Sequence, residues 1–374
     1  MKYFKHLVVF MIGLTIVLSV LFCEKKQTTL KDAYNGHFLI GIALNHWQIS
    51  GKDPASMAVV AKQFNCLTAE NAMKWEKIHP QPTEYHFSVA DSFVTLGESL
   101  NCQIIGHVLV WHSQTPQWVF QDDEGNPTDR ETLLARLKDH IDHVAGHYKG
   151  RVLGWDVVNE AFEDDGSLRE SPWKKIIGED YIEKAFILAH KADPNAELYY
   201  NDFDMWKEGK VDAVVAMVKD FQARGIPIHG IGMQGHWGHD YPLPEELDAA
   251  LSKFSKLGVH VMITEMDLNI LPRPASYTGA DIAKSYQMMD KMNPWPNGLP
   301  DSMNTVFTNR YLDLFQTFCQ YDDCITRVTL WGIQDGTSWL NFWPIRGRTA
   351  YPLLFDREYK AKPVVQQLID NRCD

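Results

Sequence analysis

Two glutamates in this sequence each follow a short apolar run directly. Glu160 lies in the segment WDVVNEA at 155–161, and Glu265 lies in the segment ITEMDL at 263–268. A pair of carboxyl groups is what hydrolysis of a glycosidic bond requires, because one protonates the departing oxygen while the other attacks the anomeric carbon or activates water. A single glutamate is more often a salt-bridge partner. Two glutamates in matching contexts predict acid, base or nucleophilic chemistry.

Polar or aromatic side chains also end most of the other short apolar runs. In chain order they are Glu70, Asn71 and Lys74; His107 and Trp111; Asn159; Asn201; Gln234 and His236; Asp267; and Trp331 and Trp339. In a barrel of parallel strands the carboxyl ends of the strands meet at one face, where the reactive groups stand. We therefore expect these side chains to converge on a single site.

The segments between these residues alternate apolar runs with amphipathic stretches. The runs fit buried parallel strands at 38–44, 65–68, 103–108, 152–158, 197–200, 230–233, 260–263 and 328–331. Apolar residues at intervals of three and four predict helices at 132–148, 211–223 and 247–257. This pattern predicts an α/β fold, a (β/α)8 TIM barrel formed by one domain at 30–374. The segment 271–304, rich in proline and glycine, predicts a long loop over the face where the seventh strand ends.

The amino-acid composition indicates which classes of ligand the protein binds. The chain has 374 residues, 45% of them apolar, and a formal charge of −12 with no basic block, so we expect no nucleic-acid partner. Twelve tryptophans favour stacking surfaces for a ligand with flat apolar faces, such as a sugar. No CxxC pair is present, and His143 and His147 lack the glutamate of an HExxH motif. We therefore expect no metal ion and no organic cofactor.

The N-terminus has the features of an export signal. Lys2 and Lys5 precede an uncharged apolar run at 7–22, and a polar stretch follows. The sequence SVLFC at 19–23 resembles a bacterial lipobox, in which the cysteine carries the lipid. We expect a signal peptide at 1–22, a lipidated Cys23 and a short polar linker at 23–29. An ordinary secreted protein and a retained single anchor are the alternatives, and each of the three places the domain outside the cytoplasm.

The sequence contains six cysteines. Cys319 and Cys324 are close in sequence at a predicted helix-to-strand turn, which makes them the first candidates for a disulfide in an oxidising compartment. If Cys23 carries lipid, at least one of the other thiols stays unpaired. The states of Cys66, Cys102 and Cys373 remain open at this point.

Six segments together resemble a known family. They are TAENAMKW at 68–75, GHVLVWHSQTPQW at 106–118, WDVVNEA, GIGMQGHW at 230–237, ITEMDL and LWGIQDGTSW at 330–339. In this order they are similar to the signature segments of glycoside hydrolase family 10, the endo-1,4-β-xylanases, from about Leu30 onward. The resemblance implies a monomer that acts on xylan and xylo-oligosaccharides without a cofactor.

The resemblance also implies residue roles. Glu160 would be the general acid/base and Glu265 the nucleophile of a retaining reaction, with Asn159, His236 and Asp267 supporting them. Sugar would be bound by Glu70, Asn71, Lys74, His107, Trp111, Gln234, Trp331 and Trp339, and on the leaving-group side by Tyr200, Asn201 and Trp237. Phe342 and Trp343 add aromatic surface beside Trp339 and depart from the common pattern. A glucanase or other β-glycanase on the same barrel, and a non-catalytic glycan-binding lipoprotein, are the remaining alternatives.

Overall fold

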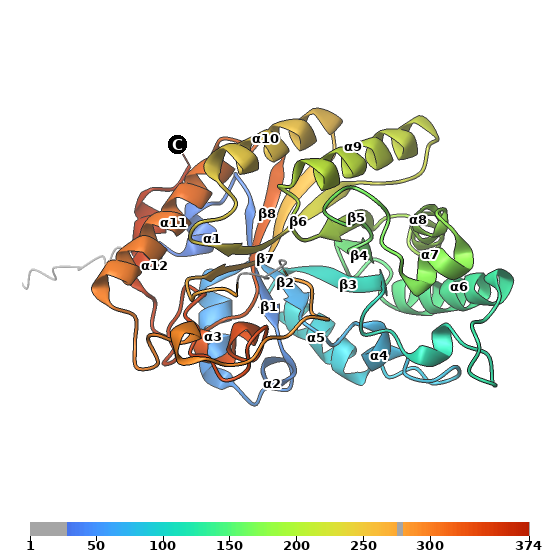
Figure 1. The fold of residues 1–374 in the computed structure, drawn as a ribbon, viewed down its shortest axis with the longest axis horizontal. Helices are drawn as coiled ribbons and strands as arrows, with labels where there is room; N and C mark the ends of the chain where they lie inside the picture. The colour runs from blue at the N-terminus through green and yellow to red at the C-terminus, as the bar shows by residue number, and fades with distance from the viewer. Residues whose placement is uncertain (1–27, 275–279, 374) are drawn as a thin grey trace, which may run out of the picture.

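The computed structural model describes residues 28–274 and 280–373. Eight parallel strands close into a barrel in chain order (Figure 1). β8 completes the ring by pairing with β1, where Leu330 lies beside Ile42. The strands are β1 (Leu39–Leu44), β2 (Cys66–Ala69), β3 (Gln103–Trp111), β4 (Gly154–Asn159), β5 (Glu197–Asp202), β6 (Gly230–Gly238), β7 (His260–Asn269) and β8 (Ile325–Leu330).

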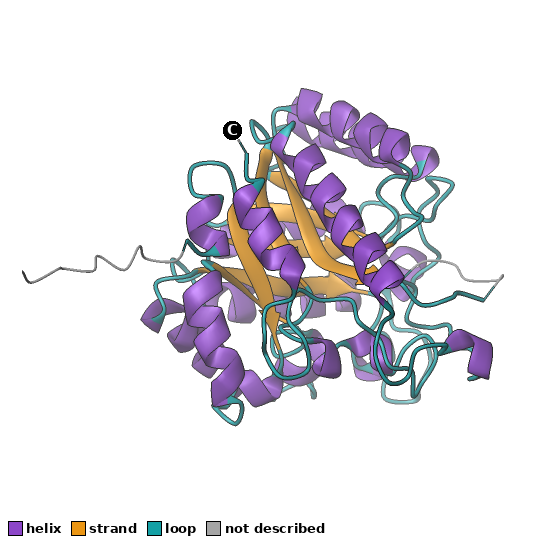
Figure 2. Cartoon of the chain, turned by 90° about the vertical axis from the view of Figure 1, so that its left-hand side faces the viewer, coloured by secondary structure: helices purple, strands orange, loops and turns teal. Residues whose placement is uncertain are grey.

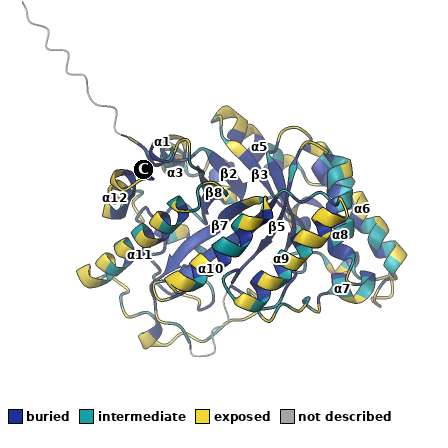
Figure 3. Cartoon of the chain, turned by 90° about the horizontal axis from the view of Figure 1, so that it is seen from above, coloured by how far each residue is buried: buried dark blue, intermediate teal, exposed yellow. Residues whose placement is uncertain are grey.

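Helices surround the barrel (Figure 2). The helices are α1 (Leu30–Ala33), α2 (His46–Ile49), α3 (Pro54–Gln63), α4 (Trp75–Ile78), α5 (Ser88–Ser99), α6 (Arg130–His147), α7 (Pro172–Ile177), α8 (Tyr181–Ala192), α9 (Glu208–Ala223), α10 (Pro244–Phe254), α11 (Asp301–Cys319) and α12 (Pro363–Asp370). The longer ones, such as α9, α10 and α11, alternate buried and exposed residues along their length (Figure 3). The 3-10 turns are η1 (Gln117–Val119), η2 (Ser255–Leu257), η3 (Asp290–Met292), η4 (Asp335–Thr337) and η5 (Trp339–Asn341). No helix within 28–274 or 280–373 is long and apolar enough to cross a membrane.

Local sequence explains where the longer helices begin. Asp53, Asp129 and Ser171 stand just before α3, α6 and α7, and each accepts a hydrogen bond from a backbone N–H of the first turn. Four helices, α3, α7, α10 and α12, begin with proline, which has no N–H to leave unpaired at that position.

The interior of the barrel is filled at the end where the strands begin. Cys66, Ile105, Tyr199 and Met262 form a separate buried cluster there. The guanidinium of Arg327 lies over the Tyr199 ring, 5.5 Å from its centroid. Gly154 is required beside that ring, because a β-carbon at this position would lie 2.6 Å from Tyr199. Polar side chains therefore gather at the other end of the barrel, where the strands finish.

The predicted fold is confirmed, with differences at element ends. β3, β6 and β7 continue to Trp111, Gly238 and Asn269, because these last residues remain paired with neighbouring strands. The predicted loop at 271–304 ends earlier, since α11 starts at Asp301. The predicted signal peptide and Cys23 lie outside the described residues.

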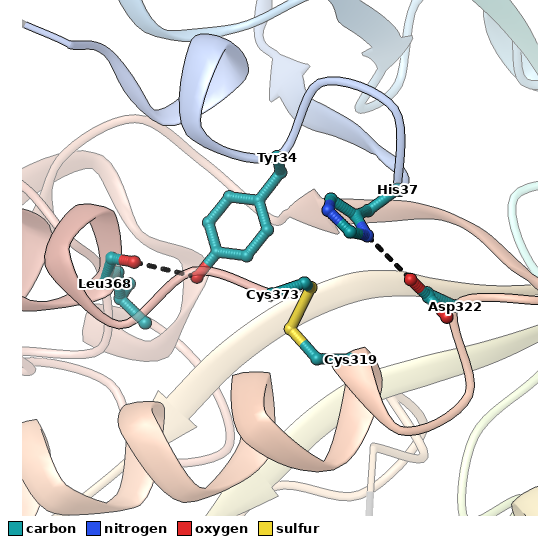
Figure 4. Close-up of a disulfide and its surroundings, with 6 residues drawn as sticks. All are labelled: Tyr34, His37, Cys319, Asp322, Leu368 and Cys373. Carbon is teal, nitrogen blue, oxygen red and sulfur yellow. Dashed lines mark hydrogen bonds and ion pairs between the residues drawn. A yellow bond between two sulfur atoms is a disulfide. The ribbon is translucent and has the colours of Figure 1, made fainter.

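The predicted Cys319–Cys324 disulfide is wrong. Cys319 at the end of α11 is bonded to Cys373, three residues beyond α12, with 5.2 Å between their Cα atoms (Figure 4). α12 packs along α11, so a residue 54 positions away in sequence is the spatial neighbour. Cys324 instead points its thiol at the Tyr321 carbonyl, and Cys66, Cys102 and Cys324 are free thiols.

Candidate active site

Both glutamates line one cavity of about 190 Å³ at the carboxyl end of the barrel. The cavity also contains most of the predicted site residues: Glu70, Asn71, Lys74, His107, Trp111, Asn159, Gln234, His236, Trp331 and Trp339. Ala280 and Ile282, from the loop that follows β7, complete its wall. Residues from six strand ends and one long loop therefore meet around the two carboxyl groups.

The backbone of both glutamates is left-handed. The φ angle is 58° at Glu160 and 54° at Glu265, a region that non-glycine residues rarely occupy. Glu265 lies where the pairing of β7 with β8 shifts register, between Ile263 and Met266. An irregularity of this kind re-aims a side chain at a strand end. Gln114, which lines the same cavity, has a φ of 47°, and three non-glycine residues held in this conformation at one site point to a function there.

The carboxylate of Glu265 is held by two donors. Asn201 Nδ2 donates to Oε1 at 2.8 Å, and His236 Nε2 donates to Oε2 at 3.3 Å. Burial acts to raise the pKa of Glu265, but the His236 hydrogen bond and the electrostatic influence of His107, His236 and Lys74 outweigh it, so the pKa is lowered. Glu265 is therefore ionised, as a nucleophile must be.

His236 carries the charge that keeps Glu265 ionised. Its Nδ1 donates to Asp267 Oδ2 at 3.0 Å while Nε2 faces Glu265. Burial acts to lower the pKa of His236, yet the charges and hydrogen bonds of Asp267 and Glu265 raise it to about 10. An imidazolium between two carboxylates therefore has both ring N–H groups paired.

Glu160 differs from Glu265 in its protonation. Trp111 Nε1 donates to Oε2 at 2.8 Å, and Asn159 Nδ2 and Gln234 Nε2 donate to Oε1 at 3.1 Å. Burial and the charge of Asp202 raise the pKa of Glu160 to about 7, outweighing the hydrogen bonds from Gln234 and Trp111. Glu160 can therefore hold a proton near neutral pH, as a general acid must.

Asn201 bridges the two glutamates, a role that differs from the predicted contact with sugar. It is fully buried, and its Nδ2 donates both to Glu265 and to Asn159 Oδ1, the latter at 2.8 Å. Thr264 Oγ1 donates to Asn201 Oδ1 at 2.6 Å and fixes the orientation of the amide. Because Asn159 in turn donates to Glu160, a continuous chain of hydrogen bonds connects Glu160 with Glu265.

Tyr200 and Trp237 also lie elsewhere than predicted. Tyr200 is buried outside the barrel wall, where its hydroxyl donates to Asp202 and accepts from the backbone N–H groups of Ala161 and Phe162. Trp237 is buried with its ring 6.2 Å from that of Phe318 in α11. Neither lines the cavity; Tyr200 instead supports the segment directly after Glu160.

Comparison with known proteins agrees with this geometry. The sequence model of glycosyl hydrolase family 10 matches residues 29–371. The chain belongs to this family. It is 46% identical over 365 residues to endo-1,4-beta-xylanase A of Xylanibacter ruminicola, which covers 98% of this chain and 99% of that protein. Beta-1,4-xylanase of Dictyoglomus thermophilum is 40% identical over 371 residues, or 98% of each chain.

Solved structures of family 10 members are similar as well. A GH10 endoxylanase retrieved from a sugarcane soil metagenome superposes with a TM-score of 0.88 at 44% identity, covering 91% of this chain and 99% of its own. A relative solved in complex with xylotriose has a TM-score of 0.81 at 35% identity, with 91% and 99% coverage.

One wall of the family 10 cavity is a polar network around Lys74. Its ammonium donates to Asn71 Oδ1 at 3.0 Å and to Gln114 Oε1 at 2.7 Å, and it lies 4.8 Å from the centre of the Trp111 ring. Burial lowers the pKa of Lys74, opposed by the charges of Glu265 and Glu70. Gln114 lies three positions beyond the end of β3 and lines the cavity, although the sequence pattern did not single it out.

The opposite wall of the cavity is aromatic. Trp339 Nε1 donates to Asp267 Oδ2 at 2.6 Å, and its ring lies 4.8 Å from that of His236. The Trp331 ring meets His107 edge-on at 5.5 Å, and His107 pairs with Asp156 at 2.9 Å. The tryptophan wall is thus tied directly to the groups that hold the nucleophile.

Within the described part of the chain, one trio has metal-ligand spacing: His37, Asp322 and Cys373. The sulfur of Cys373 is already bonded to Cys319, and none of the three residues lines the family 10 cavity (Figure 4).

Proposed function

We propose that this family 10 protein hydrolyses internal β-1,4-xylosidic bonds of xylan and xylo-oligosaccharides with retention of configuration. The observation that carries the proposal is the contrast between two carboxyl groups in one cavity, with the pKa of Glu160 raised to about 7 and that of Glu265 lowered. Retaining hydrolysis needs a protonated acid and an ionised nucleophile.

In the first half of the reaction the ionised Glu265 attacks the anomeric carbon. Its C–O bond forms as the glycosidic C–O bond breaks, and the Glu160 proton goes to the departing oxygen. Positive charge develops on the sugar ring in this step. The amide of Asn159, held by Asn201 and Gln234, faces the cavity beside the reacting carbon and is placed to bind a sugar hydroxyl.

In the second half Glu160, now ionised, takes a proton from a water molecule that attacks the same carbon. The bond to Glu265 breaks and its carboxylate returns to the hydrogen bonds of His236 and Asn201. Two inversions give net retention. The pKa of Glu160 near neutrality suits a group that must give and take a proton in one cycle.

The test measures reducing ends released from soluble xylan, carboxymethylcellulose and mannan, with the initial anomer of the product read by proton NMR. We expect cleavage of xylan with the β-anomer formed first, and no detectable rate for Glu265→Ala. Azide should restore activity of Glu265→Ala on aryl xylobiosides and give a product of inverted configuration, because a small anion fills the space of the lost carboxylate. Activity restricted to carboxymethylcellulose or mannan would assign another β-glycanase, and binding without cleavage of any polymer would assign a glycan-binding protein.

We further propose that the protein is exported and acts as a monomer attached by lipid at Cys23. A polymeric substrate found outside the cell and the Cys319–Cys373 disulfide both agree with an oxidising compartment. Labelling with a radioactive fatty acid should mark the wild type and not Cys23→Ala, and light scattering should give the mass of one chain. An unlabelled protein in the medium would assign ordinary secretion instead.

A further inference from the structure

A second, larger hollow continues from the catalytic cavity. Its volume is about 800 Å³, against about 190 Å³ for the catalytic cavity, and the two share Glu70, Asn71, Gln114 and Trp339 as wall residues. Sites of roughly 300–1,000 Å³ bury a ligand of drug-like size, which is the size of a disaccharide. The larger hollow is therefore big enough for more sugars than the catalytic cavity holds.

Two exposed aromatic side chains line this hollow, Trp47 and Phe342. Their side chains are 61% and 62% exposed, the highest values among the large hydrophobic residues of the described chain. Trp47 belongs to α2, directly after β1, and Phe342 follows η5, after β8. Because β1 and β8 are paired neighbours, the two loops that carry these residues leave adjacent strands at the same end of the barrel.

Hydrogen bonds and ring contacts hold the segments that carry Trp47 and Phe342. Asn45 Oδ1 accepts from the backbone N–H of Trp47 at 3.0 Å, and the Lys52 ammonium lies over the indole at 5.0 Å. The N–H of Phe342 donates to the Trp339 carbonyl at 2.8 Å, and Trp343 stacks on Trp339 with 4.6 Å between ring centres. These contacts hold the backbone that carries the two rings, so less backbone entropy is lost when a ligand binds.

The charges at the rim of this hollow are balanced. Lys77 pairs with Glu76 at 3.0 Å, and the other lining carboxyl group, Glu70, is under the influence of the charge of Lys74. A rim of paired charges with two exposed aromatic rings suits a neutral ligand with flat C–H faces and hydroxyl edges better than an acidic one.

We propose that Trp47 and Phe342 form an additional sugar-binding site, which holds neutral main-chain xylosyl units from the third sugar onward on the side of Glu70 and Asn71. The site adds contacts to the part of the xylan chain that becomes bonded to Glu265. Longer substrates should therefore have a higher kcat/KM than short ones. This inference rests on the proposed function and specifies which substrates that site prefers.

The test compares kcat/KM for 4-nitrophenyl β-xylobioside with that for xylotetraose, xylopentaose and xylohexaose. The aryl xylobioside occupies two sugar sites on the retained side and does not reach Trp47. Trp47→Ala and Phe342→Ala should leave its kcat/KM unchanged and lower that of xylohexaose by about 2- to 10-fold each, mainly through KM. Trp47→Tyr should keep most of the wild-type preference for long chains.

Leu243→Ala is the matched control, because Leu243 is an exposed apolar residue, 47% exposed, at the start of α10 and lines neither hollow. Equal losses on short and long substrates would overturn the proposal, as would a loss confined to insoluble xylan, which would assign the aromatic pair to polymer adsorption. A wild type inactive on the aryl xylobioside and on every oligomer would instead refute the proposed function, which separates the two failures.

Discussion

His236 in the catalytic cavity and His140 in α6 are both buried, yet their charges differ. His236 lies between Asp267 and Glu265, and these carboxylates raise its pKa to about 10. His140 stacks on Trp75 with 3.6 Å between ring centres, and its Nδ1 meets that of His79 at 3.3 Å. Burial, together with the neighbouring His79 and His143, lowers the pKa of His140 well below its usual value.

The comparison shows what decides the charge of a buried group in this protein. Burial penalises the charged form of both histidines, and only an adjacent carboxylate reverses the result. The two glutamates divide in the same way, since Glu265 faces the charged His236 while Glu160 faces neutral donors and the charge of Asp202. Charged partners therefore decide the protonation of His236 and Glu265, whereas burial has the largest influence on the pKa of His140 and of Glu160.

The largest expected effect comes from Glu160→Gln, which removes the proton and keeps the shape. On xylan we expect kcat/KM to fall by about 10²–10⁴, because the departing oxygen is no longer protonated. The wild-type rate should fall above about pH 7 as Glu160 ionises, and this limb should be absent in the variant. Pre-steady-state rates on 2,4-dinitrophenyl xylobioside, whose leaving group needs no proton, should change little for the first step. A comparable loss on that substrate would contradict the assignment of Glu160 as acid.

A smaller effect is expected from Asp267→Asn, which makes His236 more like His140. With one carboxylate gone, the pKa of His236 should fall, and Glu265 should then ionise at higher pH. The acidic limb of kcat/KM should move to higher pH, and activity should drop by about 10–100-fold near neutrality. Nitrogen-15 NMR titration of His236 checks the cause directly. An unchanged His236 titration would mean that Asp267 acts only through its bond to Trp339.

The smallest effect is expected from His140→Phe, which tests whether His140 is buried in its neutral form. The folded pKa of His140 is lowered, so its contribution to stability is complete above the unfolded value near 6.5 and is lost as pH falls below it. Between pH 8 and pH 5 the variant should lose about 2 kcal/mol less unfolding free energy than the wild type, measured by urea titration, since each pH unit below 6.5 costs about 1.4 kcal/mol. The shift at His236 acts in the opposite direction, with stability lost as pH rises from 6.5 toward 10.

The sequence predicted the barrel and the catalytic pair because both depend on local patterns. Apolar runs predict strands, and closure of the barrel brings the polar residue after each run to one end. Contacts between distant residues were not accessible in this way. Cys319 lies five residues from Cys324, yet its partner is Cys373, because packing of α12 on α11 determines which sulfurs meet.

Tyr200 and Asn201 illustrate a second limit. They are neighbours in β5, so their side chains point to opposite faces of the barrel wall. Asn201 turns inward and bridges the glutamates, while Tyr200 turns outward and holds the segment after Glu160. A motif predicts that both residues matter, but only the strand geometry assigns them different tasks.

The left-handed backbone at Glu160 and Glu265 costs conformational energy at the two positions that carry the carboxyl groups. Glycine adopts this conformation without steric cost, and at either position it would also remove a buried carboxyl group. Glycine would relieve the backbone strain, but it would leave buried donors such as Trp111 Nε1 and His236 Nε2 without these acceptors, so either replacement should lower stability as well as abolish activity. Any programme to stabilise this protein has to hold these two positions fixed and search the remainder of the chain.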